Sequence, residues 1–354
     1  MPARYCLLLI VLCLAAGCGQ DETQPVVDVQ SANAPPAEVK PVGPVVVYAT
    51  SGLGQLVDVL DAYRAETGSQ YEILAEEEAR SPNLLDTPRQ LPKTDLFIAS
   101  SLAELWSVAE DDGLRPTYSD AITGNIRDSL RDPESRWSAL SARVRLVVYN
   151  AALVSSEEID AVQDYASLGN AVWQNRLCVS SSRVAGNRSL VAFLIRQHGV
   201  SEAEAIVRRW RANFGDSVYQ SDADLLEAFA ADRCAIGIVD NSILQNVTGG
   251  SSQTGLTAHW FENGGELLID VRGAGVSRHA ANPDAAVKLL EWLTTRDGNA
   301  LFAIRQTEFP ANAASPIATA LESRAENIRN TDSLSSIGFL QEDALKLIER
   351  ARYR

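Results

Sequence analysis

Short apolar runs alternate with helical patterns along most of the chain. Residues 45–48 form an apolar run that ends in the small residues 49–52, and apolar side chains then recur at helical spacing up to Gly68. The same unit recurs at residues 95–108, 177–194 and 236–242. Apolar strands that alternate with helices are typical of parallel sheets buried on both faces. The pattern therefore predicts an α/β fold.

Each of these predicted strands ends in a loop of small hydrogen-bonding residues. Open α/β sheets bind their ligands beyond the carboxyl ends of the strands. A helix that starts after such a loop also offers unpaired backbone N–H groups and a positive dipole end to an anion. Ordinary N-capping by Ser and Asn is the alternative explanation for any single loop. Four loops of one kind favour a ligand-binding edge.

The N-terminus has the layout of an export signal. Arg4 precedes an apolar run at residues 7–16, which is too short to span a bilayer. Residues 14–18 resemble a lipobox, in which Cys18 becomes the lipidated first residue; plain secretion is the alternative. We expect a signal peptide at residues 1–17 and a flexible, proline-rich linker at 18–44. The expected location is extracytoplasmic, in the periplasm or at the cell surface, with a lipid anchor.

The chain is acidic. Its formal net charge is −15, and loss of Arg4 with the signal makes it −16. Such a surface repels nucleic acid, so we expect no nucleic-acid partner. Net charge does not identify the contents of a single cleft.

Cys178 and Cys234 are the only cysteines beyond the signal and Cys18. Both begin apparent strands, and an exported protein meets an oxidising compartment, so we predict a disulfide between them. Two buried free thiols are the alternative. A zinc cluster is not expected from two cysteines and three histidines.

Residues 126–150 carry the most specific motif, with the sequence IRDSLRDPESRWSALSARVRLVVYN. This stretch resembles the ferric-iron-binding family of ABC-transporter solute-binding proteins. The likeness continues in the same order through residues 164–168, 177–179, 187–192, 273–276 and 308–312.

The resemblance implies a type II periplasmic-binding fold, in which two α/β lobes joined at a hinge close over a ligand in a central cleft. We place the crossings between lobes near residues 141–145 and 269–273. The expected first lobe comprises residues 45–142 and 270–312, and the second comprises residues 143–269. Residues 313–354 have helical periodicity, and we expect them to pack on the first lobe.

The iron ligands of that family have no equivalents here. The family uses a His, often with an adjacent Tyr, after the first strand, a Tyr in the Ser-rich loop, a Tyr–Tyr pair in the second lobe and, in some members, a Glu. The matching positions hold Gly52 and Leu53, Gly186, Ser242 and Ile243, and Ser100. Ferric iron needs several anionic oxygen donors, so this set predicts no tight iron binding. We interpret His198, His259 and His279 as structural or surface residues and expect no metal and no cofactor.

Donors for an anion are retained. Ser181, Ser182 and Asn187 match residues that in relatives help to hold the anion that accompanies iron. Arg183 and Arg188 lie in or beside this loop and can contact a carboxylate or phosphate, or point to solvent. The predicted ligand-binding residues are Ser51, Gly52, Ser100, Ser101, Ser181, Ser182, Arg183, Asn187, Asn241 and Ser242.

The favoured function is a monomeric solute-binding lipoprotein of an ABC importer. It captures a small anionic or polyhydroxylated ligand, or an anion alone, for the importer's permease. The first alternative is an iron(III) receptor with relocated ligands, for which the available donors are Tyr48, Tyr149, Tyr219, Asp240 and Asp270. The second alternative is a lipoprotein sensor or scaffold that does not transport. An enzyme is not expected, because no nucleophile–base pair, phosphate-binding Gly loop or metal cluster appears at a usable spacing.

Overall fold

The structure is a computed structural model that describes residues 43–74, 91–215, 218–242, 255–261, 265–325 and 333–354. The expected signal peptide, Cys18 and most of the expected linker lie outside these residues, as does Ile243. No helix in the described ranges combines the length and apolar character needed to cross a membrane. The chain divides into the units Met1–Pro41 and Val42–Arg354, and the described residues belong to the second unit.

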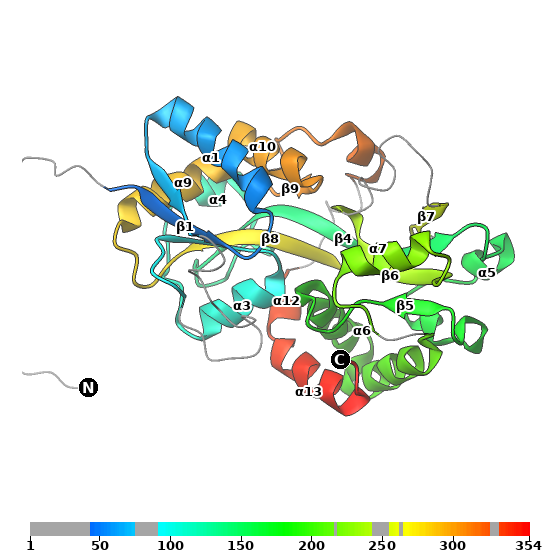
Figure 1. The fold of residues 1–354 in the computed structure, drawn as a ribbon. Coiled ribbons are helices and arrows are strands. Elements are labelled where there is room, and N and C mark those ends of the chain that lie inside the picture. Colours follow the sequence, from blue (N-terminus) through cyan, green and yellow to red (C-terminus); the bar gives the residue numbers. More distant parts are fainter. Residues whose placement is uncertain (1–42, 75–90, 216–217, 243–254, 262–264, 326–332) are drawn as a thin grey trace, which may run out of the picture. The chain divides into compact units, whose positions relative to one another are not determined.

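Helices and strands alternate along this unit (Figure 1). In chain order they are β1 (Val45–Ala49), α1 (Leu53–Thr67), β2 (Tyr71–Ile73), β3 (Leu96–Ala99), α3 (Leu102–Glu110), α4 (Asp120–Asn125), η1 (Asp128–Leu130), β4 (Ser138–Asn150), α5 (Ser156–Asp160), η2 (Ala166–Gly169), η3 (Ala171–Trp173), β5 (Leu177–Val179), α6 (Ala185–Asn213), α7 (Asp222–Ala230), β6 (Ile236–Asp240), β7 (Leu256–His259), β8 (Ile269–Val276), α9 (Pro283–Thr294), α10 (Arg296–Gln306), β9 (Phe309–Pro310), η4 (Thr319–Arg324), α12 (Ser335–Gly338) and α13 (Gln341–Ala351).

The strands form one mixed sheet in the order β2-β1-β3-β8-β4-β6-β5, and β7 and β9 also pair with β4. The outer strands are parallel, as the alternation of strands and helices predicts: β1 pairs with β2 and β3, and β5 pairs with β6. The central strands β8 and β4 are antiparallel to their neighbours. Two parallel groups of strands are therefore joined by an antiparallel centre.

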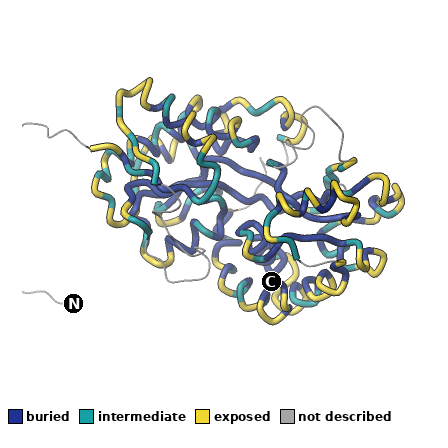
Figure 2. Tube along the Cα trace, in the orientation of Figure 1, coloured by how far each residue is buried: buried dark blue, intermediate teal, exposed yellow. Residues whose placement is uncertain are grey.

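The long strand β4 belongs to both halves of the sheet. Its residues from Ser138 to Val144 pair with β8, and those from Arg145 to Asn150 pair with β6 or β7. Nearly all of β4 and the whole of β8 are buried, and both run through the dark-blue centre of Figure 2. The two strands therefore connect the halves through the interior.

Helix α1 shows how the apolar pattern builds the first half of the sheet. Its buried residues are Leu56, Val59, Leu60 and Tyr63, the predicted helical repeat. They join a core with residues of β1, β3, α9 and α10. The helix ends at Gly68, whose φ of 73° lies in the left-handed region that glycine adopts without strain.

The predicted disulfide between Cys178 and Cys234 is present, with the two Cα atoms 5.8 Å apart. Cys178 lies in β5 and Cys234 precedes β6. These strands are parallel neighbours in which Leu177 pairs with Ile236, so their starting ends lie side by side. The bridge closes a loop that contains all of α6 and α7.

The C-terminal helices pack differently from the expectation, which placed them on the first lobe. Helix α13 packs mainly against α6, within the expected second lobe, while α12 and α13 also contact α3 (Figure 1). The Tyr353 hydroxyl donates a hydrogen bond to the Ser180 carbonyl at 2.7 Å. At Gly338, a Cβ atom would lie 2.1 Å from the Trp106 ring, so only glycine permits this approach. The C-terminal segment thus contacts helices from both expected lobes.

Removing the disulfide should destabilise the protein. We expect Cys178→Ser/Cys234→Ser to lower the free energy of unfolding by about 2–4 kcal/mol, because the bridge restricts a long loop in the unfolded chain. Urea unfolding monitored by tryptophan fluorescence measures the change. A reducing agent should lower the midpoint of the wild-type protein and leave that of the double variant unchanged. Equal midpoints for both proteins without reductant would contradict the prediction.

Candidate ligand-binding site

Alternation along β4 and β8 places polar side chains on one face of the central strands. Successive residues of a strand point to opposite faces, so Ser141, Arg143 and Arg145 share one face of β4. The register pairs Ser141 with Arg272 and Arg143 with Asp270, which brings these β8 side chains to the same face. We call these five residues the crossing-strand face. All five are buried.

Arg145 is completely buried and is held by residues of the second half of the sheet. Its Nη1 lies 2.5 Å from Oδ2 of Asp222 and 3.2 Å from Oδ1 of Asp240. Its Nη2 donates to Oδ1 of Asn187 at 2.5 Å. The Asp222 carboxylate also accepts a hydrogen bond from the Ser180 hydroxyl. Arg145 is therefore tied to the loop after β5, which carries the predicted serines.

Arg143 contacts groups from both halves of the sheet. Its guanidinium donates to the carbonyl of Ser100, in the loop after β3. The same group lies 3.4 Å from Oδ2 of Asp240 at the end of β6 and 3.3 Å from Oδ2 of Asp270 on β8. Oε1 of Glu308, just before β9, lies 4.0 Å away. One guanidinium thus meets acceptors from four chain segments.

Arg272 contacts the first half of the sheet. Its Nη2 lies 3.2 Å from Oε1 of Glu308, and its Nη1 donates to the Ser51 hydroxyl at 2.8 Å. Glu308 also accepts from the hydroxyl of Ser141. The loops after β1 and β3 thus contact the crossing-strand face through Ser51 and Ser100. The loop after β6 is fixed to β4, because the backbone N–H of Val144 donates to Oδ1 of Asn241 at 2.7 Å.

The buried charges shift one another's pKa values. Burial alone raises the pKa of Asp240, but the charges of Arg143 and Arg145 outweigh it, so this pKa is lowered. At Asp270 burial prevails and raises the pKa, although Arg143 and the backbone N–H of Leu102 act in the opposite direction. Burial acts to lower the pKa of the Arg143 and Arg145 guanidinium groups, but the neighbouring carboxylates outweigh it and raise the pKa of both. The arginines therefore stay charged.

Several predicted site residues use their polar groups for hydrogen bonds within the protein. The Asn187 amide donates to Ser180 and to the carbonyl of Ser181, and its oxygen accepts from Arg145. The Asn241 side chain bridges Val144 and Thr307. Ser101 is buried and caps α3 by accepting from Glu104 N. These three side chains position the loops.

Other predicted residues lie nearer to solvent. Ser182 and Ser242 are half-buried and Arg183 is exposed, while Ser181 is buried and accepts from the backbone N–H of Arg183. Gly52 precedes α1 with a φ of 74° and is half-buried, as are Ser51 and Ser100. These loop residues, with Arg183 exposed at the edge, are the groups best placed to meet a solute.

Sequence reasoning missed a carboxylate at this edge. Oε2 of Glu104, in the first turn of α3, accepts from the hydroxyls of Thr50 and Ser100 and from the Ser100 backbone N–H, each at 2.8 Å. Glu104 therefore joins the loops after β1 and β3. Its signal in the sequence was its place in the first turn of a predicted helix that follows Ser101.

The described residues contain no group of three or more His, Cys, Asp or Glu side chains that could hold a metal ion. The proposed relocated donors are dispersed. Tyr48 is buried against Phe97, and the Tyr219 hydroxyl lies 3.6 Å from Sγ of Cys234. Tyr149 packs on the hydrophobic core. Asp240 and Asp270 face arginines, so their carboxylates already have cationic partners.

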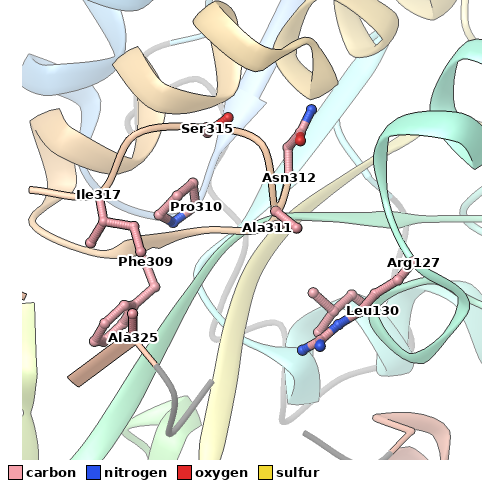
Figure 3. Close-up of a pocket in the computed structure, with 10 residues that line it drawn as sticks. Arg127, Leu130, Phe309, Pro310, Ala311, Asn312, Ser315, Ile317 and Ala325 are labelled. Atoms are coloured by element: carbon pink, nitrogen blue, oxygen red, sulfur yellow. The ribbon is translucent and has the colours of Figure 1, made fainter. Parts of the chain in front are cut away.

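A separate small hollow lies beside β9 (Figure 3). Phe309, Pro310, Ala311 and Ile317 form part of its wall, and Arg127 and Leu130 line the side across from them. None of the predicted ligand-binding residues lines it. This hollow is therefore distinct from the crossing-strand face and its loops.

Residues 60–326 match the model of a family described as bacterial extracellular solute-binding protein. The match spans well over half of the chain. This chain belongs to that family. The prediction of a solute-binding protein is confirmed, and the family is one of solute-binding proteins rather than of enzymes.

Curated relatives of this solute-binding protein have names that refer to iron. It is 24% identical over 351 residues to "Iron uptake protein A1" of Synechocystis sp., covering 96% of this chain and 93% of that relative. It is 19% identical over 258 residues to the "Fe(3+)-binding periplasmic protein" of Serratia marcescens, covering 72% of this chain and 74% of the relative. The relatives are thus described as iron-uptake or periplasmic iron-binding proteins.

Solved structures share the fold. The Trichodesmium protein in complex with iron and citrate matches with a TM-score of 0.74 and 24% identity, covering 88% of this chain and all of that one. The ferric binding protein from Campylobacter jejuni matches with a TM-score of 0.75 and 18% identity over the same shares. The predicted two-lobe, type II periplasmic-binding fold is confirmed by these likenesses.

Breaking the Arg145 pairs should be strongly destabilising. We expect Arg145→Ala to lower the free energy of unfolding by about 3–5 kcal/mol, because Asp222 would remain buried without its cation and Asp240 would keep only Arg143. Arg176→Ala is a matched control, since Arg176 pairs with Glu158 at 2.5 Å but is 29% exposed. Its cost should be about 1 kcal/mol or less. Equal losses in urea unfolding would contradict the buried pairing.

Acid should weaken the same network. A carboxyl group with a lowered pKa stabilises the fold above its unfolded pKa of about 4, and that contribution is lost as the pH falls through its folded pKa. We therefore expect the wild-type free energy of unfolding to fall more steeply below about pH 4 than that of Asp240→Asn. Urea midpoints measured across this range test the difference. Parallel pH curves would show that Asp240 has no lowered pKa.

Proposed function

We propose that this protein captures a small polar or anionic solute between its two lobes and delivers it to the permease of an ABC importer. One observation carries the proposal: the loops after β1 and β3 contact the crossing-strand face directly, and those after β5 and β6 are joined to β4 through Asn187, Asp222 and the backbone of Val144. A solute that contacts these loops contacts both halves of the sheet. The resulting link between the halves couples binding to closure.

The polarity of the site supports a solute rich in hydrogen-bonding groups. Among the described residues, Nε of Arg143 and Nε of Arg145 are buried without a hydrogen-bond partner. Buried donors normally form a hydrogen bond, so an oxygen atom of a solute or of water accepts one from each of these Nε–H groups. The half-buried Ser182 and Ser242 and the exposed Arg183 add donors at the edge. Arg183 suits a carboxylate or phosphate group, because its planar fork can donate two parallel hydrogen bonds.

The remaining parts of the proposal follow from the family and the sequence. Cys18 supplies the lipid anchor, which keeps the domain outside the cytoplasm beside its permease. The protein works as a monomer and performs no catalysis. The proposed ligand contacts are made by Ser51, Gly52, Ser100, Ser101, Ser181, Ser182, Arg183, Asn187, Asn241 and Ser242, with some acting by positioning their loops.

A ligand screen tests this function. We expect one member of a panel of phosphates, carboxylates and sugars to raise the melting temperature of the full chain without added metal. At a concentration of about 100 times Kd the stabilisation is about 2.7 kcal/mol. If the solute is an anion, Arg183→Ala should weaken binding about tenfold, the usual effect of losing a charged hydrogen bond. A screen in which ferric citrate alone stabilises the protein would refute the proposal.

Two control measurements make the Arg183 result specific. Because Arg183 is exposed, its removal should leave the melting temperature of the ligand-free protein unchanged. Arg296→Ala removes another exposed arginine, one that pairs with Asp297 on α10, and should leave solute affinity unchanged. Equal weakening by both variants would indicate a general effect of net charge.

The second candidate is an iron(III) receptor, which is favoured by the names of the curated relatives. It would need oxygen donors from outside the positions that the family uses, or iron that arrives with its own anionic chelator. If the protein supplies relocated tyrosine donors, addition of ferric salt would produce a visible tyrosinate-to-iron charge-transfer band. If iron arrives with its own chelator, ferric citrate would stabilise the protein and citrate alone would not.

A further inference from the structure

Glu104 uses only one of its two carboxylate oxygens within the described part of the chain. Its Oε2 accepts from Thr50 and Ser100 and so joins the loops after β1 and β3. Among the described residues, no donor contacts Oε1 and no cation pairs with the carboxylate. The side chain is half-buried. Glu104 therefore offers a solute an acceptor oxygen that carries negative charge.

The buried network of charges does not need Glu104 as a partner. Three guanidinium groups share four carboxyl groups there, and the members are Arg143, Arg145, Arg272, Asp222, Asp240, Asp270 and Glu308. Burial raises the pKa of Asp270, which favours its protonated form. Even with that proton in place, the other three carboxylates match the three guanidinium groups. The charge of Glu104 is therefore available to a cation that comes from outside the network.

Arg183 offers the opposite charge from the second half of the sheet. It lies in the loop after β5 and is exposed. Its backbone N–H donates to the Ser181 hydroxyl, but no acceptor contacts its guanidinium in the described part of the chain. A guanidinium in this state can bind a carboxylate through two parallel hydrogen bonds.

The two charges lie on either side of one contact between helices. The first turns of α3 and α6 meet where Ala103 packs against Ala185. Both turns also approach Asp270: the first residue of α3 donates its backbone N–H to Oδ1 at 2.9 Å, and a Cβ atom on Gly186 would lie 3.5 Å from Oδ2. The free carboxylate is one residue, and the free guanidinium two residues, from this contact along the chain. A short solute can therefore meet both.

We propose that the cleft takes a small zwitterion, a solute that carries both an ammonium and a carboxylate group. The ammonium group binds Oε1 of Glu104, and the carboxylate binds Arg183. This inference rests on the proposed function and names the chemical class of its solute. A zwitterion engages one charge from each half of the sheet, so its binding favours the closed arrangement. A plain anion leaves Glu104 without a partner and is repelled by its charge.

Matched pairs of compounds test this assignment. The probes are the common amino acids, β-alanine and γ-aminobutyrate, each compared with the carboxylate that lacks its amino group. We expect one zwitterion to bind the full wild-type chain at least about ten times more tightly than its deaminated partner, because it makes one more charged hydrogen bond. Isothermal titration calorimetry without added metal measures both affinities.

The variant Glu104→Gln separates solute contact from loop positioning. The amide oxygen of glutamine can still accept from Thr50 and Ser100, while the amide nitrogen replaces the free oxygen and the charge is lost. We expect this variant to bind the zwitterion about tenfold more weakly and the deaminated compound at least as tightly as the wild type does. Glu110→Gln is the matched control, because it removes the same charge from the other end of α3, where Glu110 pairs with Arg136. It should leave both affinities unchanged.

Three outcomes would overturn this inference. The wild type could bind the deaminated compound as tightly as the zwitterion, and this comparison decides the point if Glu104→Gln does not fold. Glu104→Gln could weaken both compounds equally, which is the result of a purely structural role. Phosphates, plain carboxylates or sugars could bind while every zwitterion fails. The proposed function fails separately, when no metal-free solute of any kind binds the wild-type protein.

Discussion

The need to pair buried charges governs the centre of this molecule. Strand alternation puts Arg143 and Arg145 on one buried face of β4, and the register with β8 adds Arg272 and Asp270. Charged groups removed from water are tolerated when partners and hydrogen bonds compensate them. Each guanidinium here has at least one carboxylate within 3.4 Å. The chain segments that supply those carboxylates are thereby fixed against the crossing strands.

The pattern of the sequence was sufficient to predict the helices and strands but not the network of buried charges. Helix α1 and its stop at Gly68 could be predicted because local spacing determines which side chains share a face. The alternation of Ser141, Arg143 and Arg145 with apolar residues was also visible in the sequence. Their partners could not be inferred, because Asp270 and Glu308 lie more than a hundred residues away and meet Arg143 only through the register of the folded sheet.

The same limit applies to the individual side chains of the predicted site. Ser and Asn side chains at strand ends predict a loop edge rich in donors, and the loops after β1 and β3 do meet, at Thr50, Ser100 and Glu104. Whether a given amide faces a ligand or its own backbone depends on neighbours distant in sequence. Asn187 and Asn241 serve the backbone and Arg145. Likewise, the periodicity of residues 340–348 predicts a helix, but it does not indicate whether α3 or α6 receives its apolar face.

Position 186 connects the missing metal ligands with the arginine network. A Cβ atom on Gly186 would lie 3.3 Å from Cδ of Arg145 and 3.5 Å from Oδ2 of Asp270. The first of these distances is tighter than an ordinary van der Waals contact, so a larger residue at this position would have to displace the buried Arg145 side chain. Glycine at position 186 therefore leaves Arg145 free to reach Asp222, Asp240 and Asn187. The residue that leads into α6 and the arginine on β4 thus depend on each other, although they lie far apart in the sequence.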